Sequence, residues 1–212
     1  MKNVVIGIIV LASLSFMTPF ALAQFGGLGD LLGAGKSKDG ASASPESVER
    51  NLKEIVGTTS TAIANLSTAI GLKEEAAKMV KNADCIQRNE CSLKDAVDIV
   101  TGSSATVRNE IEKKKASGEK LGAEASKEAS KAILPGVKAI PLWKRVGDDG
   151  TALSKDRSAM VKASGLIRAL PEVPNAMNGS ANLFKTSIDY LSFSGADTSE
   201  LQSELSKGLA GL

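Results

Sequence analysis

The chain has 212 residues, with 26 basic and 24 acidic side chains, two cysteines and no histidine. This length can bury a hydrophobic core in one domain or in two small ones, and a net charge of +2 does not indicate a nucleic acid as partner. The absence of histidine removes the commonest general base and the commonest zinc ligand, and two cysteines cannot form a four-cysteine metal site. We therefore expect no catalytic residues, no metal site and no cofactor.

The first 23 residues have the organisation of an export signal. Lys2 precedes an apolar run at residues 4–14, and Ala21-Leu22-Ala23 supplies the small residues that a signal peptidase requires. We expect a signal peptide at 1–23, cleavage after Ala23, and a periplasmic or secreted mature protein. The alternative is an uncleaved membrane anchor, because residues 4–23 would just span a bilayer. Polar residues and a proline in the second half of this stretch weaken that alternative.

Residues 24–44 are rich in glycine and serine, which predicts a flexible tether. Within it, Gly35-Lys36-Ser37 resembles the end of a nucleotide-binding P-loop. Asp30 stands where the first glycine of that motif belongs, and no strand precedes it. We therefore expect no nucleotide binding there.

Two long amphipathic stretches follow the tether. Apolar residues recur three and four positions apart over 45–83 and over 92–134, which predicts two long helices. Ser44 and Ser92 are suitable N-caps, and Gly71 is a candidate for a kink or an end in the first helix. We expect these helices to fold back on each other as an elongated antiparallel hairpin, residues 45–134.

Cys85 and Cys91 are predicted to form a disulfide in the oxidising compartment that the export signal implies. Six residues of helix rise about 9 Å, which exceeds the Cα separation of about 7 Å that a disulfide tolerates. The bond therefore requires a turn at residues 85–91, and this turn would connect the two helices of the hairpin. A redox-active dithiol and a metal clip are the alternatives. Redox pairs usually have a shorter spacing, and a metal would need further ligands.

The C-terminal region, residues 135–212, is predicted to contain three shorter helices packed on the hairpin. Residues 135–150 hold two prolines and three glycines and indicate a break. Helical spacing then recurs over 152–170, 175–193 and 199–209. Because no alternating strand pattern occurs in the sequence, the expected fold class is an all-α helical bundle.

Residues 140–145 are the main candidate for a binding surface, because apolar bulk, an indole and two cations lie next to the predicted break. The candidate residues are Ile140, Leu142, Trp143, Lys144 and Arg145. The favoured alternative is that Trp143 packs beneath the C-terminal helices while Lys144 and Arg145 point to water.

Three other motifs have simple structural interpretations. Ser154-Lys155 and Ser158 with Lys162 are interpreted as the solvated face of a helix rather than as catalytic pairs. Asp148-Asp149-Gly150 is interpreted as a plain turn rather than a calcium loop. The basic run at 113–115 is interleaved with glutamates, which is typical of a mixed helix surface rather than a phosphate-binding stripe.

These observations predict an exported, non-catalytic protein that acts by protein–protein binding or assembly in the bacterial envelope or outside the cell. Its partner would be another protein, or a second copy through self-association of helices, and not a nucleic acid. The alternative is a membrane-active or lipid-binding helical protein, either a carrier or a pore subunit, although contact with a membrane surface is not favoured. A hydrolase is the least favoured class, because no catalytic motif is evident.

Overall fold

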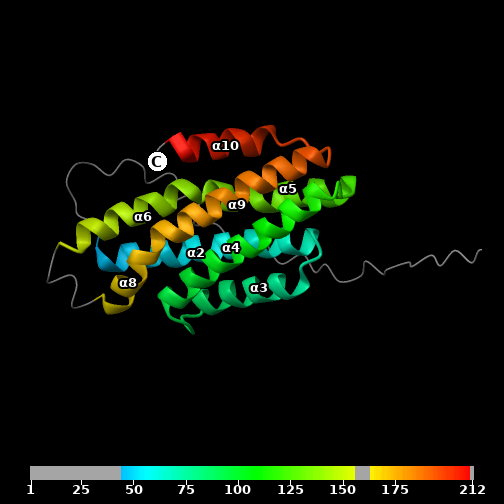
Figure 1. Cartoon of the computed structure of the whole chain (residues 1–212). Coiled ribbons are helices and arrows are strands. Elements are labelled where there is room, and N and C mark those ends of the chain that lie inside the picture. The colour runs from blue at the N-terminus through cyan, green and yellow to red at the C-terminus, as the bar shows by residue number, and fades with distance from the viewer. Residues whose placement is uncertain (1–43, 156–162, 211–212) are drawn as a thin grey trace, which may run out of the picture.

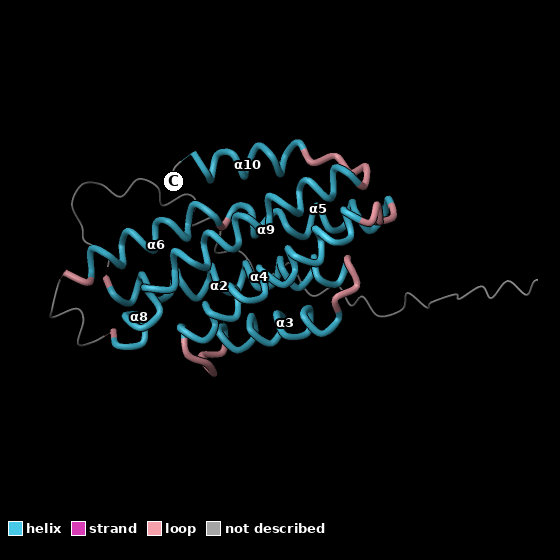
Figure 2. Tube along the Cα trace, viewed as in Figure 1, coloured by secondary structure: helices cyan, strands magenta, loops and turns pink. Residues whose placement is uncertain are grey.

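A computed structural model describes residues 44–155 and 163–210 of the chain. These residues form helices and turns without any strand, which confirms the all-α helical bundle (Figures 1 and 2). None of the helices in this part of the chain is long and apolar enough to cross a membrane. The predicted signal peptide, the tether up to residue 43, the P-loop-like motif, Ser158 and Lys162 lie outside the described residues.

Helix α2 lies at the centre of the bundle, in contact with α3, α4, α5 and α6, while α10 covers α5 and α6 from outside (Figure 1). The helices are α2 (Pro45–Ala69), α3 (Lys73–Gln87), α4 (Leu93–Ala116), α5 (Ala123–Lys138), α6 (Ile140–Leu153), α8 (Ser164–Ala169), α9 (Val173–Phe193) and α10 (Ser199–Ala210), with the short 3-10 helix η2 (Leu170–Glu172) before α9.

Both long helices of the predicted hairpin are broken in two, so the elongated hairpin is wrong. Helix α2 ends at Ala69, because Gly71 takes a left-handed conformation (φ +86°) and turns the chain into α3. Helix α4 ends at Ala116 in the same way, with Gly118 at φ +75°. Residues 45–138 therefore form a compact group of helices around α2, because α3, α4 and α5 all contact it.

Residues 135–150, predicted as a break, are helical. Helix α5 continues through Pro135 to Lys138, and α6 begins at Ile140, with only Ala139 between them. Pro135 lies in the last turn of α5, so its missing N–H removes one hydrogen bond near the helix end. A Cβ atom on Gly136 would lie 2.4 Å from Cζ of Phe184 and 2.6 Å from Cβ of Ala62. The glycine therefore allows close packing of α5 on α9 and α2.

The predicted C-terminal helices are partly confirmed. Helices α9 and α10 correspond to the predictions at 175–193 and 199–209. The predicted helix at 152–170 is wrong as a single element, because Ser154 and Lys155 form a turn after α6 and Ala163 is not helical.

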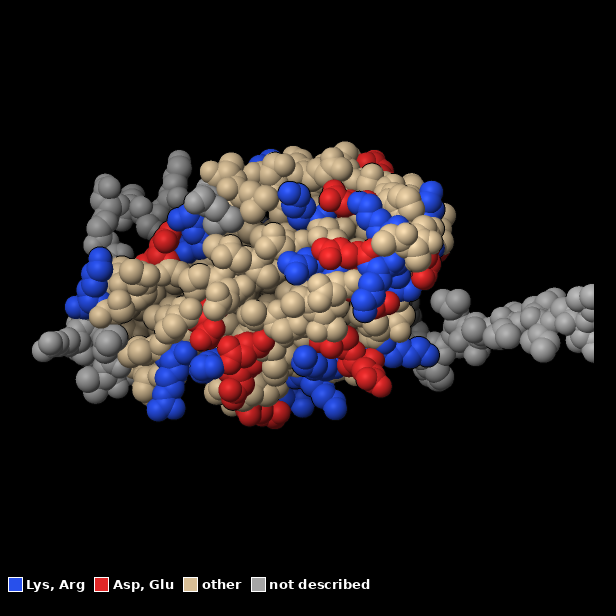
Figure 3. Space-filling view, in the orientation of Figure 1, with Lys and Arg blue, Asp and Glu red and all other residues tan. Residues whose placement is uncertain are grey.

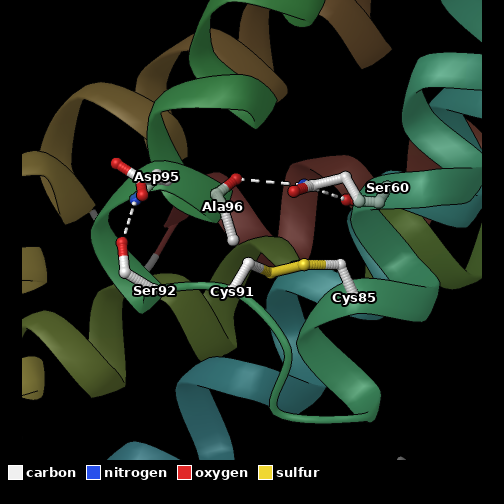
Figure 4. The surroundings of a disulfide bond; sticks show 7 residues. Ser60, Cys85, Cys91, Ser92, Asp95 and Ala96 are labelled. Carbon is white, nitrogen blue, oxygen red and sulfur yellow. Dashed lines mark hydrogen bonds between the residues drawn. A yellow bond between two sulfur atoms is a disulfide. The ribbon is translucent and has the colours of Figure 1, made fainter.

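The predicted turn between two helices at the cysteines is confirmed, but it is shorter than residues 85–91, because α3 includes Cys85 and ends at Gln87. The sulfur atoms of Cys85 and Cys91 lie at bonding distance, and their Cα atoms are 5.6 Å apart (Figure 4). Cys85 lies near the end of α3, and Cys91 precedes Ser92, whose hydroxyl accepts a hydrogen bond of 3.1 Å from the backbone N–H of Asp95. The cysteine pair therefore fixes the start of α4 to the end of α3.

Buried polar side chains connect α2 to its neighbours. The amide of Asn82 on α3 donates to Ser60 Oγ of α2 and to the carbonyl of Ala96 on α4, both at 3.0 Å (Figure 4 shows both acceptors). The indole N–H of Trp143 on α6 donates to Thr59 Oγ1 of α2 at 3.1 Å. Since a buried polar group without a partner is costly, these bonds favour one relative placement of the four helices.

Candidate functional site

The apolar part of the predicted binding surface at 140–145 lies in the core. Ile140 and Trp143 have no exposed surface and Leu142 is 6% exposed, whereas Lys144 and Arg145 are half-exposed. Lys144 forms an ion pair of 2.8 Å with Asp148 one turn further along α6. The burial of Trp143 that the sequence analysis favoured is confirmed. However, its indole N–H forms a hydrogen bond with the central helix α2, so Trp143 does not pack beneath the C-terminal helices alone.

The turn predicted at Asp148-Asp149-Gly150 is wrong, because all three residues lie within α6. A Cβ atom on Gly150 would lie 2.2 Å from Cδ2 of Leu170, so this glycine serves the packing of α6 against η2. Ser154 and Lys155 lie just beyond α6, and both are exposed, as predicted for a solvated position.

The basic run at 113–115 forms the mixed surface that the sequence predicts. Lys113 pairs with Glu110 at 3.5 Å and Lys114 with Glu119 at 2.5 Å. The hydrogen bond to Glu119 raises the pKa of Lys114, and burial is the main factor that raises the pKa of the nearby Tyr190. Two of the three lysines of the run are therefore paired with glutamates of the same chain.

Helices α4 and α9 present an exposed surface without charge, which the sequence analysis missed. Residues 99–107 and 173–184 contain no ionisable side chain, although 24% of the chain is charged. Seven residues of these two segments are exposed. Pro174 lines the cavity described below, and we call the other six the neutral face: Gly102, Ala105, Thr106, Asn175, Asn178 and Asn182. Figure 3 shows uncharged surface over much of the area where α4 and α9 lie in front in Figure 1, with most charged side chains below it and to its right.

The two helices of the neutral face lie side by side and run in the same direction. Gly179 of α9 packs on Ser104 of α4, where an added Cβ would lie 3.6 Å from the serine Cβ. Near the start of both helices, Glu172 lies close enough to Lys94 to raise its pKa, after the larger effect of Asp98. Near their ends, Tyr190 lies close enough to Lys114 to raise its pKa, after the larger effect of Glu119. The ionisable residues that flank the two charge-free segments in the sequence are acidic at the start of each, Asp98 and Glu172, and basic at the end of each, Arg108 and Lys185.

A cavity of about 480 Å³ lies next to the neutral face, between α6, α8 with η2, and the first turns of α9. Its wall is mainly apolar, and Lys144, Asp148, Thr151 and Ser154 contribute polar groups. The apolar residues are Trp143, Ile167, Leu170, Pro171, Val173, Pro174 and Met177. The volume falls within the range of about 300–1,000 Å³ that is usual for small-ligand sites.

Neither site was evident in the sequence, for different reasons. The cavity joins residues 143–154 to residues 167–177, and their meeting depends on the crossing of α6 and α9. The neutral face had a signal, the two charge-free segments, but the helical spacing alone did not show which of their residues stay exposed. Large apolar side chains contribute little to the described surface, where only Val80 and Leu209 are exposed, at 39% and 37%. Comparison of the chain with protein-family models, with curated proteins and with solved structures finds no match.

Proposed function

We propose that this protein is an exported, non-catalytic binding protein whose neutral face on α4 and α9 contacts another polypeptide. The observation that carries the proposal is that the face is exposed and yet free of charge. Charged residues are depleted from the centres of protein interfaces, because a charge that loses its water must be compensated across the contact. Asparagine and threonine side chains can form hydrogen bonds across such a contact, and Gly102 and Ala105 allow a partner to approach the α4 backbone closely.

Export is the second part of this proposal. It is supported by the signal pattern at residues 1–23 and by the cysteine pair, which suits an oxidising compartment. Protein recovered from the exported fraction of a bacterial host should begin at Gln24. A membrane-bound species that still carries Lys2 and the apolar run would contradict cleavage.

Site-directed photocrosslinking tests the binding surface directly. A photoreactive amino acid at Asn178, in the middle of the neutral face, should give a discrete crosslinked product in the exporting cell. The matched control is Ala77, an exposed residue on α3 among charged neighbours, which should give none. Adducts that are absent at Asn178, or equally abundant at both positions, would contradict the proposal.

The cavity supports a second candidate function, the carriage of an apolar ligand. The chain has one tryptophan, and this residue forms part of the cavity wall, so it can report on an occupant. An uncharged dansyl amide with an alkyl tail should quench Trp143 fluorescence by energy transfer and saturate. Thr151→Phe, which places a ring at the cavity, should weaken binding, whereas Ala152→Phe on the neighbouring exposed position should not. Quenching that does not saturate would remove this candidate.

A further inference from the structure

We infer that the partner of the neutral face is a second copy of the same chain, packed antiparallel across α4 and α9. This inference rests on the proposed function and adds the identity of the partner and the direction of packing. It is carried by the arrangement of charge around the face.

The bordering charges favour an antiparallel contact with an identical surface. Since α4 and α9 run in the same direction, Asp98 and Glu172 lie at one end of the face and Arg108 and Lys185 at the other. A two-fold axis through the middle of the face places the acidic end of each copy on the basic end of the other. A parallel contact would place like charges together, which is unfavourable.

Local ion pairs leave these bordering groups able to interact across the contact. Lys94 pairs with Asp98 at 2.5 Å and Glu112 with Arg108 at 3.6 Å, and the side chains of Asp98 and Arg108 remain 42% and 36% exposed. Solvated pairs within one helix contribute little stability. Asp98 and Arg108 can therefore form ion pairs with a partner, and weakening their local pairs costs little free energy.

The uncharged centre of the face is a requirement of self-pairing in particular. In a two-fold contact, a residue on the axis faces its own copy, so any ionisable side chain there would meet a like charge. Asparagine and threonine carry both donors and acceptors, so each can pair with itself. Asn178 lies midway between Glu172 and Lys185 on α9, which puts it close to the expected axis.

The dimensions of the face predict a reversible dimer. At 1.5 Å per residue, the charge-free length is about 15 Å on α4 and about 20 Å on α9. Two packed helices are about 20 Å wide, so each copy would bury about 300–400 Å². This is less than the roughly 800 Å² per partner of a stable interface, so we expect association in the micromolar range or weaker.

Charge complementation at the axis tests the inference. Sedimentation velocity of the exported chain should show a monomer–dimer equilibrium as its concentration rises. Asn178→Glu and Asn178→Lys should each shift this equilibrium to monomer by at least tenfold in Kd, and an equimolar mixture of the two variants should restore the dimer. The matched control pair, Ala77→Glu and Ala77→Lys, should dimerise like the parent. Circular dichroism checks that each variant keeps its helical fold.

The other outcomes separate this inference from the proposed function. A chain that stays monomeric at millimolar concentration, or a dimer that Asn178→Glu leaves intact, overturns the self-pairing. If the photocrosslinker at Asn178 also captures a different protein, the proposed function stands with another partner. If it captures nothing and the chain is monomeric, both proposals fail.

Discussion

The part of α2 that begins at Ile55 and the neutral face are both free of charge, and burial distinguishes them. Residues 55–72 of the chain carry no ionisable side chain, and most of them are buried at the centre of the bundle. Their polar groups serve the interior, as Thr59 does for Trp143 and Ser60 for Asn82. Asn178 and Asn182 of the neutral face are exposed. An uncharged segment therefore indicates a core where neighbours surround it and a contact surface where they do not.

The largest expected effect concerns the core side of this comparison. Trp143→Ala removes a fully buried indole and its hydrogen bond to Thr59, and should lower the free energy of unfolding by about 3–5 kcal/mol. Because the bond joins α6 to α2, hydrogen exchange should accelerate in both helices, which denaturant titration combined with exchange mass spectrometry would show.

Thr59→Val provides the control for this prediction. It keeps the shape of the residue but leaves the buried indole N–H without its acceptor, so it should cost less, about 1–3 kcal/mol. Faster exchange confined to residues 135–212 in the Trp143 variant would show instead that the indole serves only the C-terminal helices.

Two glycine substitutions compare the packing of the core with that of the face. Gly136→Ala places a Cβ 2.4 Å from Phe184 and should destabilise the fold by about 1–3 kcal/mol through overpacking. Gly179→Ala meets only ordinary contacts at 3.6 Å, so the better helix propensity of alanine should leave stability unchanged or raise it by up to about 1 kcal/mol. Thermal unfolding measures both, and equal effects at the two sites would contradict the difference in packing.

These glycines and prolines also show which parts of the fold the sequence could predict. The caps Ser44 and Ser92, the cysteine turn and helices α9 and α10 follow from local signals, and the structure has them all. The break at Gly118 was missed because the apolar spacing continues in phase across it, although three lysines before a Ser-Gly pair are a typical helix end. Local signals predict a break at Pro135 and Gly136, but both residues lie in α5. The role of Gly136 depends on Phe184 and Ala62, which are distant in sequence.

The same limit applies to the candidate site. The sequence singled out Trp143 as the notable aromatic residue. Its hydrogen-bond partner Thr59 lies 84 residues earlier in the chain, so no local pattern predicts this contact. The charge-free segments at 99–107 and 173–184 were visible, but only the parallel packing of α4 and α9 makes them one surface.

The cysteine pair connects the core to the face, because it fixes the start of α4. Replacing Cys85 and Cys91 by serine should lower stability by about 2 kcal/mol, since the chain-entropy model gives this value for so small a loop. The helices keep their buried contacts, so circular dichroism should still show a cooperative transition. Free thiols in protein recovered from the exported fraction, measured by alkylation and mass spectrometry, would show that the bond does not form in the cell.

The smallest expected effect concerns the neutral face itself. Asn182→Glu adds a charge to an exposed position of α9, where the new carboxylate can pair with Lys185 one turn away for about 0.2–0.5 kcal/mol. Exposed substitutions of this kind usually change stability by less than about 0.5 kcal/mol. The fold alone therefore gives no reason for this surface to lack charge. If the variant unfolds like the parent in urea but loses its crosslinked product at Asn178, the absence of charge serves binding. A loss of several kcal/mol would mean instead that Asn182 belongs to the core, and the comparison between the two charge-free regions would no longer hold.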